Sequence, residues 1–592
     1  MKQLFKAILI LGVGFVSSGI LLGQSPAAPP AIEGIWEAKH YAEPNPAGTL
    51  DIIDKNGKWN AQIAQFNVAV TVQGDRVTFE LPGAHGRFAG RFVAAHSSIR
   101  GHWSQAAGNF YSPVVLAALG RNDWRGEVVP LADEWTMYLV ITRNADGSLG
   151  AFIRNPDRNR GFFWSLNRAE LDGNRIKLIG KFLNRGEDRV FGEGNVYPND
   201  DLLSIYFPER STTYDFRRVK DDSSPGFYAL AKNQYEYHPP IPYDDGWKVG
   251  TLDEAGIAKE PLNELLRVIN SPPASVHDLD LHSLLIARHG KLVFEEYFHG
   301  FNRTKPHDLR SAAKSVAATI VGAVMQSGGN LSESTHVYNL LYRGKIPGDF
   351  DPRKKEMTVR HLLTMSSGFD CNDWADSQRP GSEDTLEEQR DAGLRDYYDF
   401  TLRLPMDSSP GAKPAYCSVT ANLLGAVLKA ATNRPVQELF QDLVAEPLQM
   451  HRYYLGPQPS GEPYLAGGMY LLPRDYMKFA QLMLNGGVWN GKRILSAEFA
   501  ARAGSPLVKI EGQYPGMRYG YLWWTVEYPY HGRTIHAYFA SGNGGQEAVA
   551  IPELDLVVLA TGGNYNDRAG WSMVREYIPK FILAAVKDEP RR

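Results

Sequence analysis

The sequence has little of several features that would place a protein in a functional class directly. It contains 2 cysteines in 592 residues, which excludes a disulfide-rich scaffold and a cysteine-based zinc site. Whether this one pair, Cys371 and Cys417, forms a disulfide stays open at this stage. The 63 Lys and Arg residues nearly balance the 66 Asp and Glu residues, so no excess charge is available to hold a phosphate backbone. We therefore expect no nucleic-acid partner.

Sequence motifs of several enzyme classes are also missing. There is no H-E-x-x-H, no EF-hand loop, no Walker A stretch and no G-x-G-x-x-G following a strand. There is no G-x-S-x-G elbow, which argues against an α/β-hydrolase. These absences lead us to predict that the protein has no metal site and uses no cofactor.

The only long apolar run lies at the beginning of the chain. It extends over residues 7–22, follows Lys2 and Lys6, and is interrupted by glycine and serine. A short apolar run after a basic start is typical of a secretory signal peptide, with a membrane anchor as the alternative. We interpret residues 1–27 as a signal peptide. We expect an exported protein, periplasmic or extracellular, without a membrane span in the mature chain.

Residues 31–220 show the pattern of β-structure. Apolar residues alternate with polar ones on both sides of Gly74-Asp75, and similar turns occur at Asn56-Gly57 and Gly173-Asn174. Alternation around glycine-containing turns predicts antiparallel hairpins. Many short strands with regular turns predict one all-β domain, a barrel or sandwich that is lipocalin-like.

The pattern changes after this region. Residues 221–246 are rich in Pro, Ser and Asp and have no periodicity, so we predict a linker there. In residues 247–592 helical and strand signals mix. One strand pair is expected around His289-Gly290 and another over residues 546–560. We therefore predict a multidomain protein whose second domain is α/β (α+β), with an antiparallel sheet built from both ends of the segment and a helical insertion.

The sharpest chemical signal is a serine followed three residues later by a lysine. Ser311 and Lys314 lie at the beginning of an alanine-rich segment that predicts a buried helix closing at Gly328. This spacing places both side chains on one helix face. A serine hydroxyl needs a base to become a nucleophile, and a lysine with a lowered pKa can be that base. The alternative is a capping serine followed by a solvated lysine.

Flanking segments favour the catalytic interpretation. The S-x-x-K segment resembles the active-site helix of the serine β-lactamase and penicillin-binding-protein superfamily. Over residues 245–585 the chain is similar to the class C β-lactamase-related branch of that superfamily. The resemblance is carried by residues 285–300, 358–368, 466–475 and 484–496. It implies a β-lactamase-like fold for the second domain.

Two further family motifs are present in altered form. Tyr416-Cys417-Ser418 stands where the family has Tyr-x-Asn, and the resemblance implies that the Tyr416 phenol relays a proton. Ala540-Ser541-Gly542 stands where the family has Lys-Thr-Gly or His-x-Gly, so a cation is missing. This form resembles the esterase and 6-aminohexanoate-dimer hydrolase members.

The resemblance also implies the remaining site residues. The backbone N–H groups of Ser311 and Asn543 would form the oxyanion hole, and Ser418, Ser541 and Gly542 would contact substrate. The resulting hypothesis is a serine hydrolase that cleaves a small-molecule ester, amide or peptide through an acyl-enzyme on Ser311. The alternatives are a β-lactamase or D-Ala peptidase, or a non-catalytic binding or sensing protein.

Overall fold

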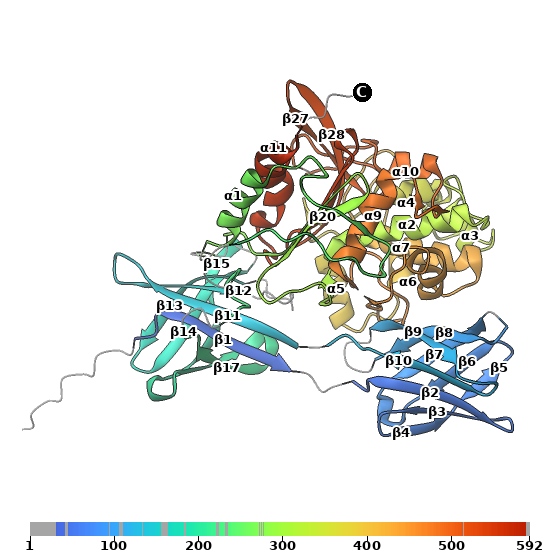
Figure 1. Cartoon of the computed structure of the whole chain (residues 1–592), viewed down its shortest axis with the longest axis horizontal. Coiled ribbons are helices and arrows are strands. Elements are labelled where there is room, and N and C mark those ends of the chain that lie inside the picture. The colour runs from blue at the N-terminus through green and yellow to red at the C-terminus, as the bar shows by residue number, and fades with distance from the viewer. Residues whose placement is uncertain are drawn as a thin grey trace, which may run out of the picture.

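The computed structural model of the protein contains three structural units (Figure 1). The first is built from two separate stretches of chain and the other two from one stretch each. The structure describes residues 31–41, 45–93, 95–105, 110–132, 134–154, 164–182, 185–220, 224–230, 235–271, 273, 275, 277–512 and 514–587. The predicted signal peptide, residues 1–27, lies outside these residues. Within the described part, no helix combines the length and apolar character needed to cross a bilayer.

The first unit is a closed eight-stranded antiparallel barrel. Its strand order is β1-β11-β12-β13-β14-β15-β16-β17, and β1 pairs with both β11 and β17. Alternate side chains such as those of Trp36, Leu139 and Phe216 fill the interior. The strands are β1 (Gly34–Tyr41), β11 (Glu134–Arg143), β12 (Leu149–Arg154), β13 (Trp164–Asp172), β14 (Arg175–Phe182), β15 (Arg185–Tyr197), β16 (Leu202–Phe207) and β17 (Thr212–Arg218).

The second unit is a sheet inserted between the first two strands of the barrel; we call β2 to β10 the inserted sheet. It has the order β4-β3-β2-β10-β9-β8-β7-β6-β5 and encloses its own apolar core, which includes Trp103 and Phe88. The strands are β2 (Gly48–Lys55), β3 (Lys58–Ile63), β4 (Phe66–Ala69), β5 (Thr71–Gln73), β6 (Arg76–Glu80), β7 (Arg87–Val93), β8 (Ser98–Ser104), β9 (Tyr111–Ala118) and β10 (Asp123–Val128).

The all-strand character of this region is confirmed, as are the hairpins predicted at Asn56-Gly57, Gly74-Asp75 and Gly173-Asn174. The expectation of one β domain needs refinement, because the two sheets have separate cores. The chain leaves the barrel at Tyr41 and returns at Glu134, which pair directly with each other. A period of two marks strands but does not specify partners so distant in sequence, so the nesting was not predicted.

The third unit contains an eight-stranded sheet built from both ends of its segment, as predicted. Strand β19 lies between β20, its neighbour in sequence, and β30 from the end of the chain. Left-handed His289 and Gly290 form the tight turn between β19 and β20. In sheet order the strands are β18 (Lys248–Val249), β20 (Lys291–Tyr297), β19 (Leu281–Arg288), β30 (Leu556–Gly562), β29 (Gln546–Ile551), β28 (Arg533–Gly542), β27 (Trp524–Tyr530) and β26 (Arg518–Tyr519).

Helices cover this sheet, and most of them come from the predicted insertion between β20 and β26. In Figure 1 the sheet stands between α1 and α11 on one side and α2 and α9 on the other. The helices are α1 (Lys259–Ile269), α2 (Ala313–Gln326), α3 (Val337–Leu341), α4 (Val359–Leu363), α5 (Glu383–Asp391), α6 (Tyr397–Arg403), α7 (Ser418–Thr432), α8 (Val436–Phe440), α9 (Pro473–Leu484), α10 (Ala497–Ala503) and α11 (Leu583–Ala585). The π-helical turns η8 (Gln441–Ala445) and η11 (Met573–Ile582) extend α8 and precede α11.

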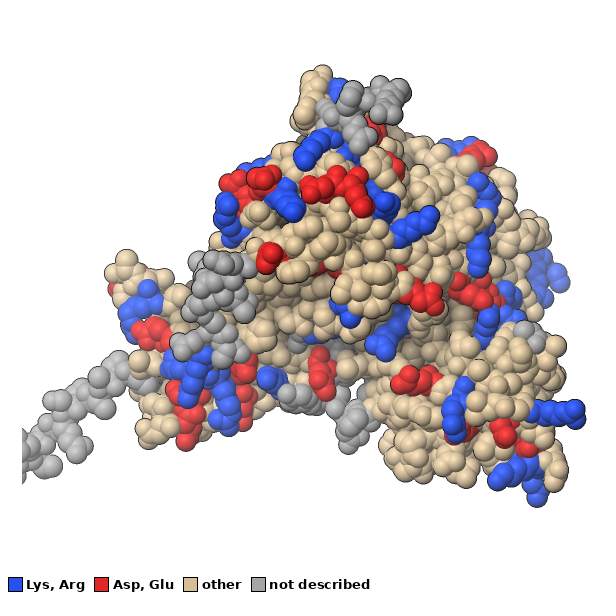
Figure 2. Space-filling model, viewed as in Figure 1, with Lys and Arg blue, Asp and Glu red and all other residues tan. Residues whose placement is uncertain are grey.

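Both β units contact the third unit, and they form two lobes along one side of it (Figure 2). Arg154 of the barrel forms a buried ion pair with Asp280, at 3.0 Å between Nη2 and Oδ1. The inserted sheet continues into the third unit through a bridge between Tyr111 of β9 and Leu455 of β22 (Tyr453–Leu455). Strand β22 pairs in turn with β23 (Met469–Leu471), and β23 with β21 (His307–Asp308). The inserted sheet is thereby joined to the segment that carries Ser311.

Candidate active site

Ser311 lies in a 3-10 turn, Arg310–Ala312, that runs directly into the predicted helix α2. The residue before it, Arg310, has a left-handed backbone with φ of +49°, which is uncommon for a residue with a side chain. The Asp308 carboxylate accepts the Arg310 N–H at 3.0 Å and holds this turn. Such locally strained backbone is frequent at functional sites. The Ser311 side chain is half-buried and lines a cavity.

Lys314 points back at Ser311. Its Nζ donates to Ser311 Oγ at 3.0 Å and to the Ala466 carbonyl at 2.8 Å. The side chain is 1% exposed, so water does not compete for these two contacts. The fixed direction of the amine is what transfer of the Ser311 proton would need.

Tyr416 lies beside this pair. Lys314 Nζ is 5.0 Å from the centre of the Tyr416 ring. Burial raises the pKa of the Tyr416 phenol, whereas the charge of Lys314 and hydrogen bonds with Ser311 and Lys314 oppose that rise. The ring stacks on Trp374 at 4.9 Å and on Trp524 at 5.7 Å between centroids. The three predicted catalytic side chains therefore meet at one place.

A carboxylate that the sequence did not indicate supports Tyr416. The Asp373 N–H donates to the Tyr416 carbonyl at 2.9 Å, and Asp373 Oδ2 accepts the N–H of Ser418 at 2.7 Å. Its other oxygen accepts the N–H of Glu383 at 2.9 Å. Burial and the nearby Glu383 raise the pKa of the Asp373 carboxyl to about 7, while the charge of Lys314 opposes the rise. Asp373 thus fixes the backbone on both sides of Cys417.

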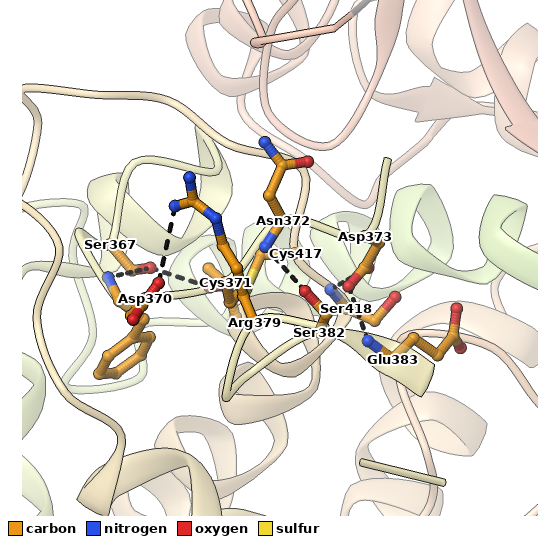
Figure 3. Close-up of a disulfide and its surroundings, with 12 residues drawn as sticks. Ser367, Asp370, Cys371, Asn372, Asp373, Arg379, Ser382, Glu383, Cys417 and Ser418 are labelled. Atoms are coloured by element: carbon orange, nitrogen blue, oxygen red, sulfur yellow. Dashed lines mark hydrogen bonds and ion pairs between the residues drawn. A yellow bond between two sulfur atoms is a disulfide. The ribbon is translucent and has the colours of Figure 1, made fainter. Parts of the chain in front are cut away.

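The two cysteines form a disulfide next to these contacts (Figure 3). Cys371 and Cys417 are 5.9 Å apart at Cα, and the bond ties the segment before Asp373 to the residue after Tyr416. Figure 3 shows Asp373, Ser418 and Glu383 on one side of the disulfide, with Asn372 bonded to Ser382 next to it. The pairing that the sequence left open therefore lies within the site.

The end of strand β28 approaches the nucleophile closely. A Cβ added to Gly542 would lie 2.0 Å from the Leu309 carbonyl oxygen, so only glycine fits there. The next residue, Asn543, lines the same cavity as Ser311. Its side chain exchanges two hydrogen bonds with Asn566, and within the described residues its backbone N–H donates to no other group. This N–H is therefore free for an oxyanion.

The other predicted binding residues are placed less directly. Ser418 begins α7 and is fully buried, and Ser541 is 7% exposed on β28. Neither these two nor Gly542 is among the described residues that line the cavity. Ala540 is fully buried and carries no charge, and this position of β28 therefore offers no cation to a substrate. A direct substrate contact by Ser418, Ser541 or Gly542 stays a prediction.

The cavity at Ser311 has a volume of about 970 Å³ and lies between two structural units. The inserted sheet contributes one wall, with Arg87, Gln105 and Tyr111 among its residues. Helix α5 contributes Glu383 and Glu387, whose mutual repulsion and burial raise the pKa of Glu387. The sequence patterns of these segments predicted strands and helices but gave no sign that they share a cavity with Ser311. Among the described residues, no group of three or more His, Cys, Asp or Glu side chains is arranged to hold a metal ion.

Comparison with known proteins gives the type of domain that carries these residues. Residues 282–569 match the family model described as Beta-lactamase. The C-terminal part of the chain is thus a beta-lactamase-like domain. The match includes Ser311, Lys314 and Tyr416, while the barrel and the inserted sheet lie outside it.

Two curated relatives and one solved structure illustrate the likeness. The 6-aminohexanoate-dimer hydrolase of Paenarthrobacter ureafaciens is 26% identical over 222 residues, covering 36% of this chain and 54% of that protein. Esterase EstB of Burkholderia gladioli is 26% identical over 185 residues, covering 28% and 44%. The chain thus spans about half the length of the curated relatives it matches. Simvastatin synthase of Aspergillus terreus aligns with a TM-score of 0.42 at 16% identity, covering 55% of this chain and 99% of that one.

Proposed function

We propose that the protein is a serine hydrolase that cleaves an ester or amide of a small molecule through an acyl-enzyme on Ser311. The observation that carries the proposal is the convergence of three groups. Lys314 Nζ lies 3.0 Å from Ser311 Oγ, and the buried Tyr416 phenol lies beside both. A capping serine with a solvated lysine would not bury the amine or aim it at the hydroxyl. The names of the two curated relatives, a hydrolase and an esterase, support the same reaction class.

In the proposed mechanism, Lys314 and Tyr416 together take the proton of Ser311 as Oγ bonds to the substrate carbonyl carbon. The carbonyl oxygen becomes an oxyanion, which the N–H groups of Ser311 and Asn543 stabilise. The proton passes through Tyr416 to the leaving oxygen or nitrogen as the bond to it breaks. Water then attacks the acyl-enzyme, and Ser311 regains its proton.

The departures from the family motifs favour an ester or linear amide over a β-lactam. Ala540 stands where a cation would attract the carboxylate of a penicillin or a D-Ala peptide, and Ser418 replaces the amide of asparagine. We therefore expect hydrolysis of p-nitrophenyl butyrate by the purified protein, with much slower hydrolysis of nitrocefin. Comparable rates on the two substrates would instead favour a β-lactamase.

The decisive test is replacement of the nucleophile. Ser311→Ala is expected to abolish labelling by a fluorophosphonate probe and to lower ester hydrolysis by roughly 10⁴-fold or more, because the reacting atom is removed. Ser327→Ala is a matched control, since Ser327 ends the same helix and its hydroxyl only caps the Val324 carbonyl. Full labelling of the Ser311→Ala variant would refute the assignment. A wild-type chain that neither reacts nor turns over would favour a binding protein.

We also propose that the protein is exported, as the basic and apolar N-terminal run suggests. The disulfide between Cys371 and Cys417 supports an oxidising compartment, where such bonds persist. Fractionation of cells that produce the full chain, with mass spectrometry of its N-terminus, tests this. Intact residues 1–27 on a cytosolic protein would contradict it.

A further inference from the structure

A second cavity of about 500 Å³ adjoins the cavity at Ser311. The two share four lining residues: Arg87, Tyr111, Ser460 and Gly461. The second cavity lies where the inserted sheet meets the end of α7 and the beginning of α8. We call this second cavity the extension, because it adjoins the cavity at Ser311 at these four residues.

Cations outnumber acids among the described residues that line the extension. Arg76, Arg87, Lys429 and Arg434 border it, against the single carboxylate of Glu462. Lys429 is bonded to Glu462 and Arg434 to Asp442, so these two cations are neutralised. The remaining two belong to the inserted sheet, and Arg76 makes only a loose contact of 3.9 Å with Glu438.

Arg87 is held in position by a neutral group. Its Nη2 donates to the Tyr111 hydroxyl at 3.3 Å, and that hydroxyl donates to the Gly461 carbonyl at 2.6 Å. Glu80 faces Arg87 across the β6–β7 ladder, yet among the described residues no ion pair joins Arg87 to Glu80 or to any other acid. The guanidinium is thus oriented without having its charge neutralised.

The other cations of the main cavity have different surroundings. Arg395 also lines the cavity at Ser311, but it does not line the second cavity. Arg310 lies 3.9 Å from Asp308, and Arg390 is bonded to Asp391. Ala540 provides no charge at the strand edge. Among the described cations that line the cavity at Ser311, Arg87 is the one that also borders the second cavity.

We propose that Arg87, together with Arg76, which also lines the extension, forms a subsite for a carboxylate that is remote from the scissile bond. The substrate class would be esters or amides whose acyl chain ends in a second carboxylate, an inference that rests on the hydrolase function proposed above. A planar guanidinium can donate two hydrogen bonds to the two oxygens of a carboxylate. Hydrogen bonds between charged partners are stronger than those between neutral groups. The inserted sheet thereby supplies from another structural unit the cation that Ala540 does not provide.

The test compares matched substrates. Mono-p-nitrophenyl esters of adipate, pimelate, suberate and sebacate are paired with neutral esters of the same chain length. Wild-type protein is expected to prefer the charged ester at one or more of these lengths. Arg87→Met is expected to lower kcat/KM for that charged ester by about tenfold or more, with less than about twofold change for its neutral partner. Arg87→Lys should keep an intermediate preference, since it retains the charge without the fork.

Two control variants sharpen the result. Glu80→Gln is expected to strengthen the preference for the charged ester, because it removes the acid that faces Arg87 across the β6–β7 ladder. Arg125→Met should change nothing, since Arg125 lies on the inserted sheet away from the cavity and pairs with Asp51. An equal effect of Arg87→Met on charged and neutral esters, or no effect on either, would overturn the subsite.

A binding measurement separates this proposal from the hydrolase function. The Ser311→Ala chain is titrated calorimetrically with pimelate and suberate, with and without Arg87→Met. The subsite predicts saturable dicarboxylate binding that Arg87→Met weakens by about tenfold. Such binding with a wild-type protein that hydrolyses no ester would leave the subsite standing and refute the hydrolase. Absent or unchanged binding, together with active ester hydrolysis, would refute the subsite alone.

Discussion

The barrel and the inserted sheet are both antiparallel β units, but they contact the beta-lactamase-like domain in different ways. The barrel contact is centred on Arg154 and Asp280, whose side chains are 5% and 2% exposed. Three buried histidines surround Asp280: His299 Nε2 lies 3.4 Å from Oδ1 and His282 Nε2 lies 3.7 Å from it, while His282 Nδ1 bonds His307 Nε2 at 2.7 Å. Of the described barrel residues, none lines the cavity at Ser311.

The inserted sheet makes a more exposed contact that reaches the cavity itself. Arg91 pairs with Asp442 and Arg100 with Glu446, at positions one turn apart along η8 and its continuation. Their side chains are 17% to 46% exposed, so water and salt screen them. The unit that is closer in sequence to the third unit is therefore not the one that shapes the site. The barrel contacts the third unit away from the cavity, whereas the sheet inserted between two barrel strands forms a wall of the cavity.

The largest effect is expected from breaking the barrel anchor. Arg154→Ala leaves the buried Asp280 carboxylate without its cation. Removal of one partner of a buried ion pair typically lowers the free energy of unfolding by about 3–5 kcal/mol. We expect a lower calorimetric Tm and faster proteolysis within residues 221–246. Arg143→Ala is the control, since its pair with Glu33 lies on the exposed barrel surface. Equal stability of the two variants would show that the buried pair does not anchor the barrel.

Acid should loosen the same contact through the buried histidines. Burial lowers the pKa of His299 and of His307 from 6.5 to about 4. Between these values the folded protein binds fewer protons than the unfolded chain, so the free energy of unfolding falls as pH falls from 6.5 towards 4. Each histidine lowers the free energy of unfolding by about 1.4 kcal/mol per pH unit. Between pH 6.5 and pH 5 this amounts to about 2 kcal/mol per histidine.

His299→Asn should flatten this dependence, as measured by Tm between pH 7 and pH 5. His536→Gln is the control, because His536 is exposed and its bond to Glu553 raises the pKa. The contact of the inserted sheet contains one comparable group, His102, whose pKa burial lowers to about 3. A pH dependence that survives His299→Asn unchanged would assign the effect to other groups.

The smallest effect is expected at the inserted sheet. Asp442→Asn weakens the bonds from both Arg91 and Arg434 and should cost about 1 kcal/mol, as partly exposed pairs do. We expect KM for long neutral esters to rise a few-fold, with p-nitrophenyl acetate unaffected, and about 0.5 M salt to reduce the difference. Neutral esters are used because the change also releases Arg434, which lines the second cavity. Asp51→Asn, in the same sheet but paired with Arg125, should leave KM for both substrates unchanged. An effect on acetate hydrolysis equal to that on long esters would mean that this contact also positions Ser311.

Much of the C-terminal site was predictable because its signals are local. The spacing of Ser311 and Lys314 fixes their relative position on one turn of helix, and the turn at His289-Gly290 marks a hairpin by backbone chirality. The sheet built from both ends followed from two strongly apolar strand pairs. Tyr416 was reached through the family resemblance, which the structure supports by placing the ring beside Lys314.

The parts that were not predicted depend on partners far apart in sequence. Nothing around Asp373 indicates that its backbone holds Tyr416, because that contact arises from folding of a loop against the beginning of α7. In the sequence, Arg87 cannot be told apart from any other polar residue of a strand. It reaches the cavity at Ser311 only because the inserted sheet packs against the third unit. The disulfide was left open because a single pair of cysteines has no pattern to interpret.

The nesting of one sheet inside another also sets an order of assembly during synthesis. Strand β1 leaves the ribosome first, yet Trp36 and Glu37 must wait for the end of β17 before the barrel can close around them. By then the inserted sheet, complete at Val128 and with its own core, has been available for folding while most of the barrel was still unmade. One edge of β1 therefore stays unpaired until β11 is made and the other until β17 is made, and unpaired strand edges are the sites at which chains aggregate.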